Sequence, residues 1–257
     1  MISKILIPKN HPRYCSLKIR EKLVEGFEKG LVAREGLIAH GRGESFDYLL
    51  GEKTIEPALK SIDAASALFI LAEHPVISVN GNTAAICASQ ICDLNRSLEK
   101  SSVEINLFYH THVREELIST ELKKYGLKKI LGIDPNRSTQ IPELESNRRK
   151  VDLDGIFVSD VVFVPLEDGD RTIALKKMDK KIITVDLNPL SRTALASDIS
   201  IIDNIVRALP RIIKSIEYHK KNSTKKELKE IVDSFNNKDI LNESLDIMRS
   251  NKMLSKI

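Results

Sequence analysis

The chain has 257 residues, of which 42% are hydrophobic and 5% aromatic, with no tryptophan. The net charge is +4, and residues 220–257, with nine Lys or Arg against six Asp or Glu, carry +3 of it. A nearly neutral body with few aromatic side chains argues against a nucleic-acid partner, which needs a basic stripe and stacking platforms. The length predicts one main folded unit with a small appendage.

The cysteines and the hydropathy indicate the compartment. Cys15, Cys87 and Cys92 form neither a CxxC pair nor an even framework, which suits a reducing environment and a role in packing. The N-terminal apolar run is too short for a signal peptide, and no stretch approaches the roughly 20 apolar residues of a membrane span. We therefore expect a soluble, cytoplasmic protein with no membrane partner.

Two helices are predicted ahead of the first strand. Residues 14–30 repeat apolar side chains at helical spacing and end at Gly30, a plausible helix stop. Residues 55–73 become apolar on almost every side, which predicts a buried helix. The chain thus begins with an N-terminal helical segment.

From residue 75 onward, short runs rich in Val and Ile alternate with amphipathic segments. Continuously apolar strands separated by helices are typical of a parallel sheet covered on both faces. We therefore predict an α/β, Rossmann-like fold with a mostly parallel sheet, whose ligands bind beyond the carboxyl ends of the strands. The predicted strands are residues 75–80, 103–109, 128–133, 160–166, 181–187 and 199–203, and the helices begin at Thr83, Val113, Arg171, Pro189 and Ile205.

Two segments depart from this alternation. Residues 135–154 read as a long polar loop, which is either a lid or binding loop or else a solvated surface excursion. Beyond Asn222 the composition turns to Lys, Glu, Asn and Ser with amphipathic spacing, which predicts a small helical hairpin. We divide the chain into a ligand-binding domain, residues 1–221, and a helical C-terminal extension, residues 222–257.

The first strand ends in Asn80-Gly81-Asn82-Thr83. This sequence allows a tight turn, and Asn82 or Thr83 can cap the next helix, which leaves backbone N–H groups directed at an anion. An ordinary strand-to-helix turn is the alternative. The segment nevertheless lies where a ligand is expected.

A second strand ends in Asp186-Leu187-Asn188-Pro189. A carboxylate at a strand tip can accept from ribose hydroxyls, and Asn188 adds a donor and an acceptor. Pro189 suits a first helical turn, so Arg192 and Thr193 fall near its positive end, where a guanidinium can bind phosphate. The pattern predicts a nucleotide site, although Asp186 as a helix cap with a solvated Arg192 is equally compatible.

The acidic stretch before the helix predicted at Arg171 is a candidate for Mg²⁺. Glu167 and Asp168 can serve such a site, whereas Asp170 is better placed to cap the helix. His110 and His112 lack an obvious third ligand, so we interpret them as surface histidines. The sequence leaves the metal-binding residues undefined.

Residues 36–52 place glycines on both sides of His40 and Arg42. Missing side chains let backbone approach a ligand, and Arg42 adds charge. Arg20, on the first predicted helix, faces either an anion or solvent. Neither GxGxxG nor GxxxxGK[ST] occurs, so a standard dinucleotide fingerprint and a P-loop are both excluded.

Several of these segments together resemble the archaeal phosphopantothenate synthetase family, also called 4-phosphopantoate–β-alanine ligase. The resemblance covers about residues 10–218 in chain order and does not extend to the tail. It rests on HPRYCSLKIREKLVEGFEKGLVA, GLIAHGRGESFDYLLGEKT, PVISVNGNTAA, VEINLFY, VPLEDGDRT, ITVDLNPLSRTA and IIDNIVRA.

The resemblance implies a homodimeric enzyme of archaeal coenzyme A biosynthesis. It implies that ATP and Mg²⁺ drive the joining of 4-phosphopantoate and β-alanine to 4′-phosphopantothenate, through an acyl-adenylate, with release of AMP and pyrophosphate. The family's ATP-contacting positions fall on Arg20, Arg42, Asp186, Leu187, Asn188, Arg192, Thr193, Asn204 and Ile205.

Further roles are hypotheses from placement at strand ends. We expect Arg42, His40 and Asn82 to act in catalysis, and Asn80, Asn82, Glu167 and Asp168 to hold the substrates. Two rival interpretations remain. One is a nucleotide-binding regulatory module without turnover; the other is a nicotinamide-dependent dehydrogenase, which the missing glycine fingerprint opposes.

Overall fold

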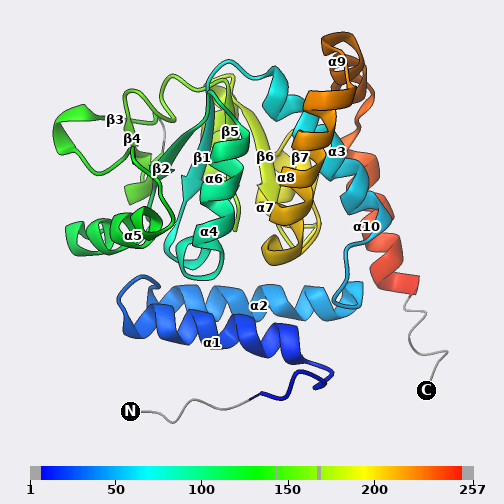
Figure 1. Cartoon of the computed structure of the whole chain (residues 1–257), viewed down its shortest axis with the longest axis horizontal. Coiled ribbons are helices and arrows are strands. Elements are labelled where there is room, and N and C mark those ends of the chain that lie inside the picture. The colour runs from blue at the N-terminus through cyan, green and yellow to red at the C-terminus, as the bar shows by residue number, and fades with distance from the viewer. Residues whose placement is uncertain (1–6, 143, 167–168, 251–257) are drawn as a thin grey trace.

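The computed structural model describes residues 7–142, 144–166 and 169–250. Within these residues the central layer is a sheet of five parallel strands in the order β2-β1-β5-β6-β7, with helices on both faces (Figure 1). The predicted Rossmann-like architecture is confirmed. The strands are β1 (Pro75–Val79), β2 (Ser102–Ile105), β5 (Val161–Phe163), β6 (Lys181–Val185) and β7 (Ile199–Ile201).

The helices follow the predicted order along the chain. The predicted N-terminal helical segment is present (Figure 1). The C-terminal extension contains two helices, as predicted, but they pack on α3 rather than on each other, so they do not form the predicted hairpin. The helices are α1 (Tyr14–Glu28), α2 (Arg34–Leu50), α3 (Glu56–Leu71), α4 (Gly81–Ser97), α5 (His112–Lys124), α6 (Gly169–Lys177), α7 (Arg192–Ala196), α8 (Ile205–Asn222), α9 (Lys225–Ser234) and α10 (Asn237–Ser250).

Successive residues of the strands face two separate cores. Phe163 and Ile183 belong to the larger core, which the helices α3, α4 and α8 cover. Phe69 of α3 packs edge-on against Phe163, with 5.8 Å between the centroids of the two rings. Val162 and Ile182, one position earlier on the same strands, belong to a smaller core with α6 on the other face. Since both faces are buried, apolar residues occupy most positions on both faces of the strands, as the sequence predicts.

Two segments differ from the prediction. Residues 128–133 form no strand: a single bridge joins Leu131 to Glu104, because the chain reaches the edge strand β2 for only one residue. The predicted polar loop contains a short antiparallel hairpin, β3 (Ser138–Gln140) and β4 (Lys150–Asp152). The hairpin gives this segment a fixed backbone beside the sheet.

The glycine-containing segment 36–52 is not an open loop but the greater part of helix α2. Glycine weakens an isolated helix, but buried Glu44, Asp47 and Leu50 anchor this one to the body. Together with α1, the helix α2 lies across the carboxyl ends of the strands (Figure 1). The N-terminal segment therefore covers the edge at which parallel sheets bind ligands.

The C-terminal helices α9 and α10 pack on the body of the protein. Leu241 and Met248 of α10 join the larger core. The side chain of Asn237 donates to the carbonyls of Ala194 and Ser197, both at 3.0 Å, and accepts from the N–H of Ser200 at 2.8 Å. These bonds attach the start of α10 to the segment between α7 and β7.

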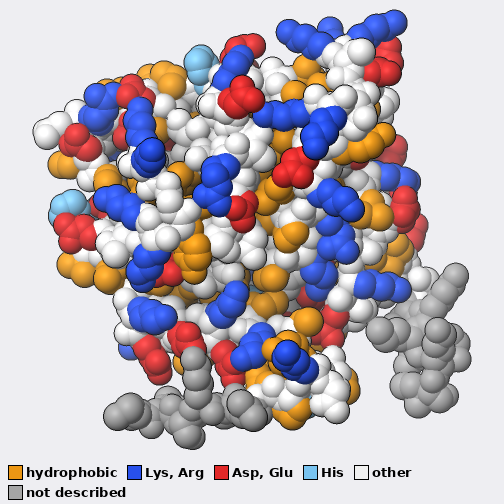
Figure 2. Space-filling model, in the orientation of Figure 1, with side chains coloured by type: hydrophobic (Ala, Val, Ile, Leu, Met, Phe, Trp, Pro, Cys, Tyr) orange, Lys and Arg blue, Asp and Glu red, His pale blue; other side chains and the backbone are white. Residues whose placement is uncertain are grey.

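None of the helices in the described ranges combines the length and apolar character needed to cross a bilayer. On the face shown in Figure 2, Lys and Arg side chains are interspersed with Asp and Glu.

The buried carboxyl of Glu104 makes stability depend on pH. It accepts from the N–H groups of Asp152 (3.1 Å) and Ile156 (2.7 Å), which fastens β4 to β2. Burial nevertheless raises the pKa of Glu104 to about 7, from an ordinary value near 4.5. The folded protein then binds a proton that the unfolded chain has released, so this residue's contribution to stability falls as pH rises from about 4.5 to about 7.

In the wild type we expect the Glu104 carboxyl to lower the free energy of unfolding by on the order of 3 kcal/mol between pH 4.5 and pH 7. Glu104→Gln should remove this decline. The measurement is the free energy of unfolding in urea at several pH values between 4.5 and 7.5. Glu116→Gln, at an exposed position of α5, is the matched control. An unchanged pH slope in the Glu104 variant would show that the carboxyl ionises normally.

Candidate active site

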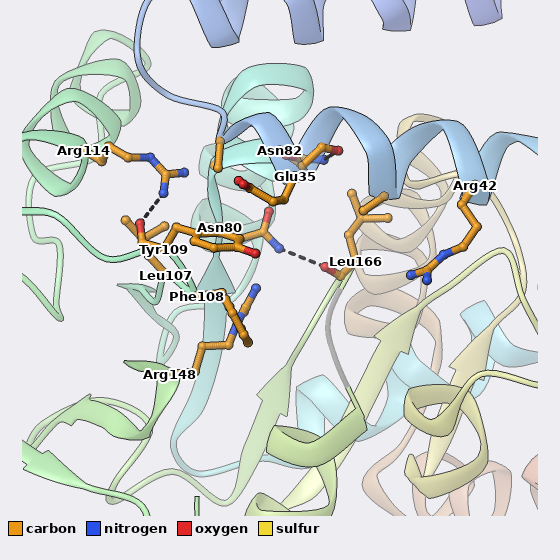
Figure 3. Close-up of a pocket in the computed structure, with 14 residues that line it drawn as sticks. Glu35, Arg42, Asn80, Asn82, Leu107, Phe108, Tyr109, Arg114, Arg148 and Leu166 are labelled. Carbon is orange, nitrogen blue, oxygen red and sulfur yellow. Dashed lines mark hydrogen bonds between the residues drawn. The ribbon is translucent and has the colours of Figure 1, made fainter. Parts of the chain in front are cut away.

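The strand order reverses between β1 and β5, because the chain passes from β1 to β2 on one side and then to β5 on the other. Ligands of open parallel sheets bind beside such a switch point, beyond the carboxyl ends of the strands. A cavity of about 280 Å³ lies there (Figure 3). Its lining is Ala33, Glu35, Gly36, Ala39, Arg42, Asn80, Gly81, Asn82, Leu107, Phe108, Tyr109, Arg114, Arg148 and Leu166.

Asn80 joins the two strands at the switch point. Its Oδ1 accepts from the backbone N–H (2.9 Å) and the hydroxyl (3.1 Å) of Thr83, and its Nδ2 donates to the carbonyls of Pro165 and Leu166, both at 3.1 Å (Figure 3). Asn80 is thus the cap of α4. The prediction that Asn82 or Thr83 caps the helix is wrong, because α4 begins before both, at Gly81.

Asn82 joins the helices α2 and α4. Its Nδ2 donates to the carbonyl of Gly36 at 2.8 Å. A Cβ at Gly36 would lie 2.3 Å from Oδ1 of Asn82, so the two helices can approach this closely only with glycine at that position. Both predicted asparagines therefore lie in the cavity wall, with side-chain hydrogen bonds that fix its shape.

Arg42 lies between this cavity and the end of β6. Its side chain is exposed on α2 and lines the cavity near Leu166 (Figure 3). Its charge also acts on Asp186, and the next residue, Gly43, lies beside Leu187, whose Cδ1 is 3.9 Å from a Cβ built there. The structure thus brings Arg42 and Asp186, which are far apart in sequence, to one edge of the sheet.

Asp186 begins a hydrogen-bonded turn after β6. Burial raises the pKa of its carboxyl, against hydrogen bonds from the Ser191 hydroxyl (2.5 Å) and the Asn188 N–H (2.9 Å) and against the charge of Arg42. The Oδ1 of Asn188 accepts from the N–H of Leu190 at 2.9 Å. The turn is therefore rigid before any ligand binds.

Helix α7 begins at Arg192 rather than at Pro189, and Ser191 caps it by accepting from the N–H of Ala194 at 3.0 Å. Asp186 is therefore not the cap of α7, so this part of the alternative interpretation of the motif is wrong, whereas its other part, an exposed Arg192, agrees with the structure. Arg192 is 66% exposed and pairs with Asp170. The side chain of Thr193 is buried at the first turn of α7.

Arg192 lines a second cavity, of about 350 Å³, and Phe108 lines both cavities. The two cavities are therefore neighbours.

The acidic stretch before α6 differs from the prediction in one respect. Asp170 lies inside α6, whose first residue is Gly169, so its predicted role as N-cap is wrong. Glu167 and Asp168, the predicted metal or substrate ligands, lie outside the described residues.

Arg20 and His40 form a second group of predicted residues, between α1 and α2. The Nε of Arg20 donates to Glu44 at 2.7 Å. Burial lowers the pKa of His40, the charge of Glu44 opposes this, and the charge of Arg20 adds to it. The imidazole is therefore neutral at pH 7 and can accept a proton or a hydrogen bond.

A buried ionic network fixes the C-terminal half of α2 to the end of β7. Arg207 donates through Nη2 to Asp47 (2.6 Å) and through Nε to Asp203 (2.8 Å). Asn204 caps α8 and donates to Asp47 at 3.0 Å, and Ile205 lies in the larger core. Strand-end patterns did not indicate Arg207: Asp203 is only four residues earlier in the chain, but Asp47 is brought to Arg207 by the tertiary structure alone.

Two further arginines of the cavity, Arg114 and Arg148, were also missed. Arg114 lies in the first turn of α5 and Arg148 in the short turn before β4. Neither follows a strand directly, and their segments are 34 positions apart, so spacing gives no sign that they meet. The strand ends alone indicated the site.

The described residues contain no group of three or more His, Cys, Asp or Glu side chains arranged to hold a metal ion. His110 and His112 instead meet the carboxylate of Glu115, at 2.7 and 3.2 Å. The protein groups described here therefore form no dedicated metal cage. Glu35 is the one carboxylate in the described lining of the cavity, and a cation that arrives with phosphate oxygens takes one or two protein carboxylates.

The chain is similar in sequence to known proteins over most of its length. The phosphopantothenate/pantothenate synthetase family model matches residues 57–251, which include both α9 and α10. The similarity therefore extends into the C-terminal tail, beyond residue 218 where the resemblance seen in the sequence motifs ended. The 4-phosphopantoate–beta-alanine ligase of Thermococcus kodakarensis is 55% identical over 240 residues, 93% of this chain and 90% of that protein. The protein of the same name from Methanosarcina mazei is 47% identical over 239 residues, 93% and 92% of the two chains. The chain therefore belongs to the phosphopantothenate/pantothenate synthetase family.

Proposed function

We propose that the protein is an ATP-dependent ligase that condenses 4-phosphopantoate with β-alanine to 4′-phosphopantothenate and releases AMP and pyrophosphate. The observation that carries the proposal is the place of Arg42, which lines the switch-point cavity and acts on Asp186 at the neighbouring strand end. One guanidinium can thus face both an acyl donor in the cavity and a nucleotide beside Asp186. The names of the relatives support the choice of substrates.

The proposed chemistry proceeds in two steps. A carboxylate oxygen of 4-phosphopantoate attacks the α-phosphorus of ATP, and the bond to the departing pyrophosphate breaks. The amine of β-alanine, after losing a proton, attacks the acyl carbon, and AMP leaves with the electron pair of the acyl–oxygen bond. The first step brings together several anionic groups, so fixed cations are needed to offset their repulsion.

We assign the nucleotide side to the family's ATP-contacting positions. Asp186 is placed to accept from the ribose, and Arg42, Arg20 and Arg192 to face phosphates, with Leu187, Asn188, Thr193, Asn204 and Ile205 shaping the surrounding strand ends. Mg²⁺ bound with ATP would neutralise phosphate charge in the first step. Glu167 and Asp168 remain our proposed carboxylates for the metal or for the ammonium of β-alanine.

We assign the acyl side to the switch-point cavity. Asn80 and Asn82 hold its wall in place. His40 lies between α1 and α2, outside the described lining of this cavity, and is neutral at pH 7 because burial lowers its pKa. We propose it as the acceptor of the amine proton. Arg42 joins the two sides.

An omission experiment tests the function. Purified protein incubated with ATP, Mg²⁺, 4-phosphopantoate and β-alanine should release AMP and form the amide product, and leaving out any one component should stop amide formation. ATP binding without AMP release in the complete mixture would contradict the ligase and favour a regulatory module. Binding of a nicotinamide cofactor would instead favour a dehydrogenase.

We further propose a cytoplasmic homodimer. Val24 on α1 and Ile38 and Leu49 on α2 are apolar yet 45%, 71% and 45% exposed. Exposed apolar side chains on neighbouring helices favour association. Ile38 and Leu49 are about three helical turns apart and so share a face of α2. Sedimentation of the purified protein should show a dimer, and a monomer at micromolar concentration would contradict it.

A further inference from the structure

The switch-point cavity has two cationic ends. Arg42 occupies the end near β6, and Arg114 and Arg148 occupy the other end, near Phe108 and Tyr109 (Figure 3). The wall between these ends is largely apolar, with Leu107, Leu166 and Ala39 among its residues. A ligand that fills the cavity should therefore be anionic at both ends and apolar between them.

The protein holds the guanidinium of Arg114 in a fixed position. Nη2 donates to the carbonyl of Leu31 at 2.9 Å, and Nη1 donates to the carbonyl of Tyr109. Nε has no hydrogen-bond partner among the described residues. Burial lowers the pKa of Arg114, the charge of Glu35 opposes this, and the charge of Arg148 adds to it. Two like charges thus lie close together, and a bound anion would relieve their repulsion.

Arg148 is brought to the cavity by the hairpin. Its side chain is among the buried ones, and its carbonyl accepts from Nδ2 of Asn106 at 3.2 Å. The neighbouring Asn147 donates to the carbonyl of Phe108 at 3.1 Å. These bonds fasten the turn before β4 to the segment that follows β2, so both arginines belong to rigid parts of the molecule.

The first turn of α4 completes this end of the cavity. A Cβ at Gly81 would lie 2.8 Å from Nη2 of Arg114, so the guanidinium rests directly on the helix N-terminus. The positive end of the helix dipole and the guanidinium of Arg114 therefore meet in one place, and Arg148 lines the same cavity. Glu35 is the one carboxylate in the described lining, so cations outnumber anions at this end.

We infer that Arg114, Arg148 and the N-terminus of α4 bind the phosphate monoester of the acyl donor and set the preference for a phosphorylated over an unphosphorylated donor. The inference rests on the proposed function for the identity of the donor. With its phosphate at this end, 4-phosphopantoate places its two methyl groups against the apolar wall and its carboxylate toward Arg42. The carboxylate then lies on the side where the nucleotide is expected.

The test measures binding, so that it does not depend on turnover. Calorimetric titrations with 4-phosphopantoate, unphosphorylated pantoate and MgATP are compared for the wild type, Arg148→Gln and Arg114→Lys. Loss of charge-assisted hydrogen bonds should weaken 4-phosphopantoate binding roughly 100-fold in Arg148→Gln. Arg114→Lys keeps the charge and should weaken it less, roughly 10-fold. Pantoate and MgATP should bind each variant within about threefold of the wild type.

Arg149→Gln is the matched control, since Arg149 is the next residue of the same hairpin and pairs with Gln140 outside the cavity. It should bind all three ligands as the wild type does. An equal loss of affinity for 4-phosphopantoate and for pantoate would overturn the inference. A loss of affinity for MgATP alone would also overturn it, because it would assign this end of the cavity to the nucleotide. Unchanged 4-phosphopantoate binding in both variants would overturn it as well. Failure of the wild type to release AMP in the omission experiment would count against the ligase alone.

Discussion

Arg42→Lys should lower kcat/KM for the ligation by about 100-fold or more while leaving the stability of the fold unchanged. Lysine keeps the charge but cannot present a planar fork of donors to two groups at once, and the loss of a donor aimed at developing charge typically costs two to three orders of magnitude. The exposed side chain of Arg42 makes no hydrogen bond to another described residue in the structure, so removing the fork should cost little stability.

Steady-state kinetics with ATP and with 4-phosphopantoate as the varied substrate measure the effect. Arg34→Lys is the matched control, because Arg34 is an exposed residue of the same helix and lies outside the cavity lining. A thermal melt within about 2 °C of the wild type, the scale of a change below 1 kcal/mol, confirms the fold. Near-normal kinetics in the Arg42 variant would remove this residue from the site.

Arg207→Met should destabilise the protein by about 3 to 5 kcal/mol, because it leaves two carboxylates uncompensated in the interior. The side chains of Asp47 and Asp203 are 4% and 0% exposed, and Arg207 bridges them. Asp203 also accepts from the Thr54 hydroxyl at 2.6 Å, so the network joins α2, β7 and α8. The expected loss corresponds to a fall of roughly 10 °C in Tm.

Denaturation in urea measures this loss. Arg211→Met removes a charge one turn further along α8, where the side chain is exposed and donates only to the carbonyl of Arg207 among the described residues, and it should change stability by less than about 0.5 kcal/mol. Asp47→Asn added to Arg207→Met should recover part of the loss, since one unpaired charge is gone. Equal stabilities of the Arg207 and Arg211 variants would show that the network contributes nothing.

The elements that the sequence predicts well are those whose environment is uniform along their length. Strands buried on both faces are apolar at most of their positions, as β1 and β6 are, and their order along the chain places Asp186 at a carboxyl end. The family resemblance gave Arg42 and Arg20, already noted in the sequence, an ATP-contacting role. The distance of these two side chains from the strand ends depends on the tertiary structure, and no local sequence pattern predicts it.

Helix α2 illustrates what local rules miss. Gly36, Gly41 and Gly43 each weaken a helix, and they suggested backbone open to a ligand. In the structure, Gly36 instead admits the side chain of Asn82 and Gly43 lies beside Leu187, while ion pairs of Glu44 and Asp47 hold the helix in place. The tertiary contacts outweigh the propensity.

The cationic end of the cavity was missed for a similar reason. Arg114 and Arg148 are surrounded in sequence by polar residues that read as solvated surface. Arg148 becomes part of the site because Asn106 and Asn147 dock the hairpin against the segment after β2. Arg114 becomes part of it because its guanidinium donates to the carbonyls of Leu31 and Tyr109. Sequence periodicity reports the faces of elements, and it says nothing about docking of this kind.

Transfer of oxygen from donor to nucleotide tests most directly the claim that the carboxylate of 4-phosphopantoate meets the α-phosphate of ATP beside Arg42. In the complete mixture, 4-phosphopantoate labelled with ¹⁸O in its carboxylate should yield AMP that carries one ¹⁸O atom, detected by mass spectrometry. Unlabelled AMP, or label in inorganic phosphate released with ADP, would contradict the account.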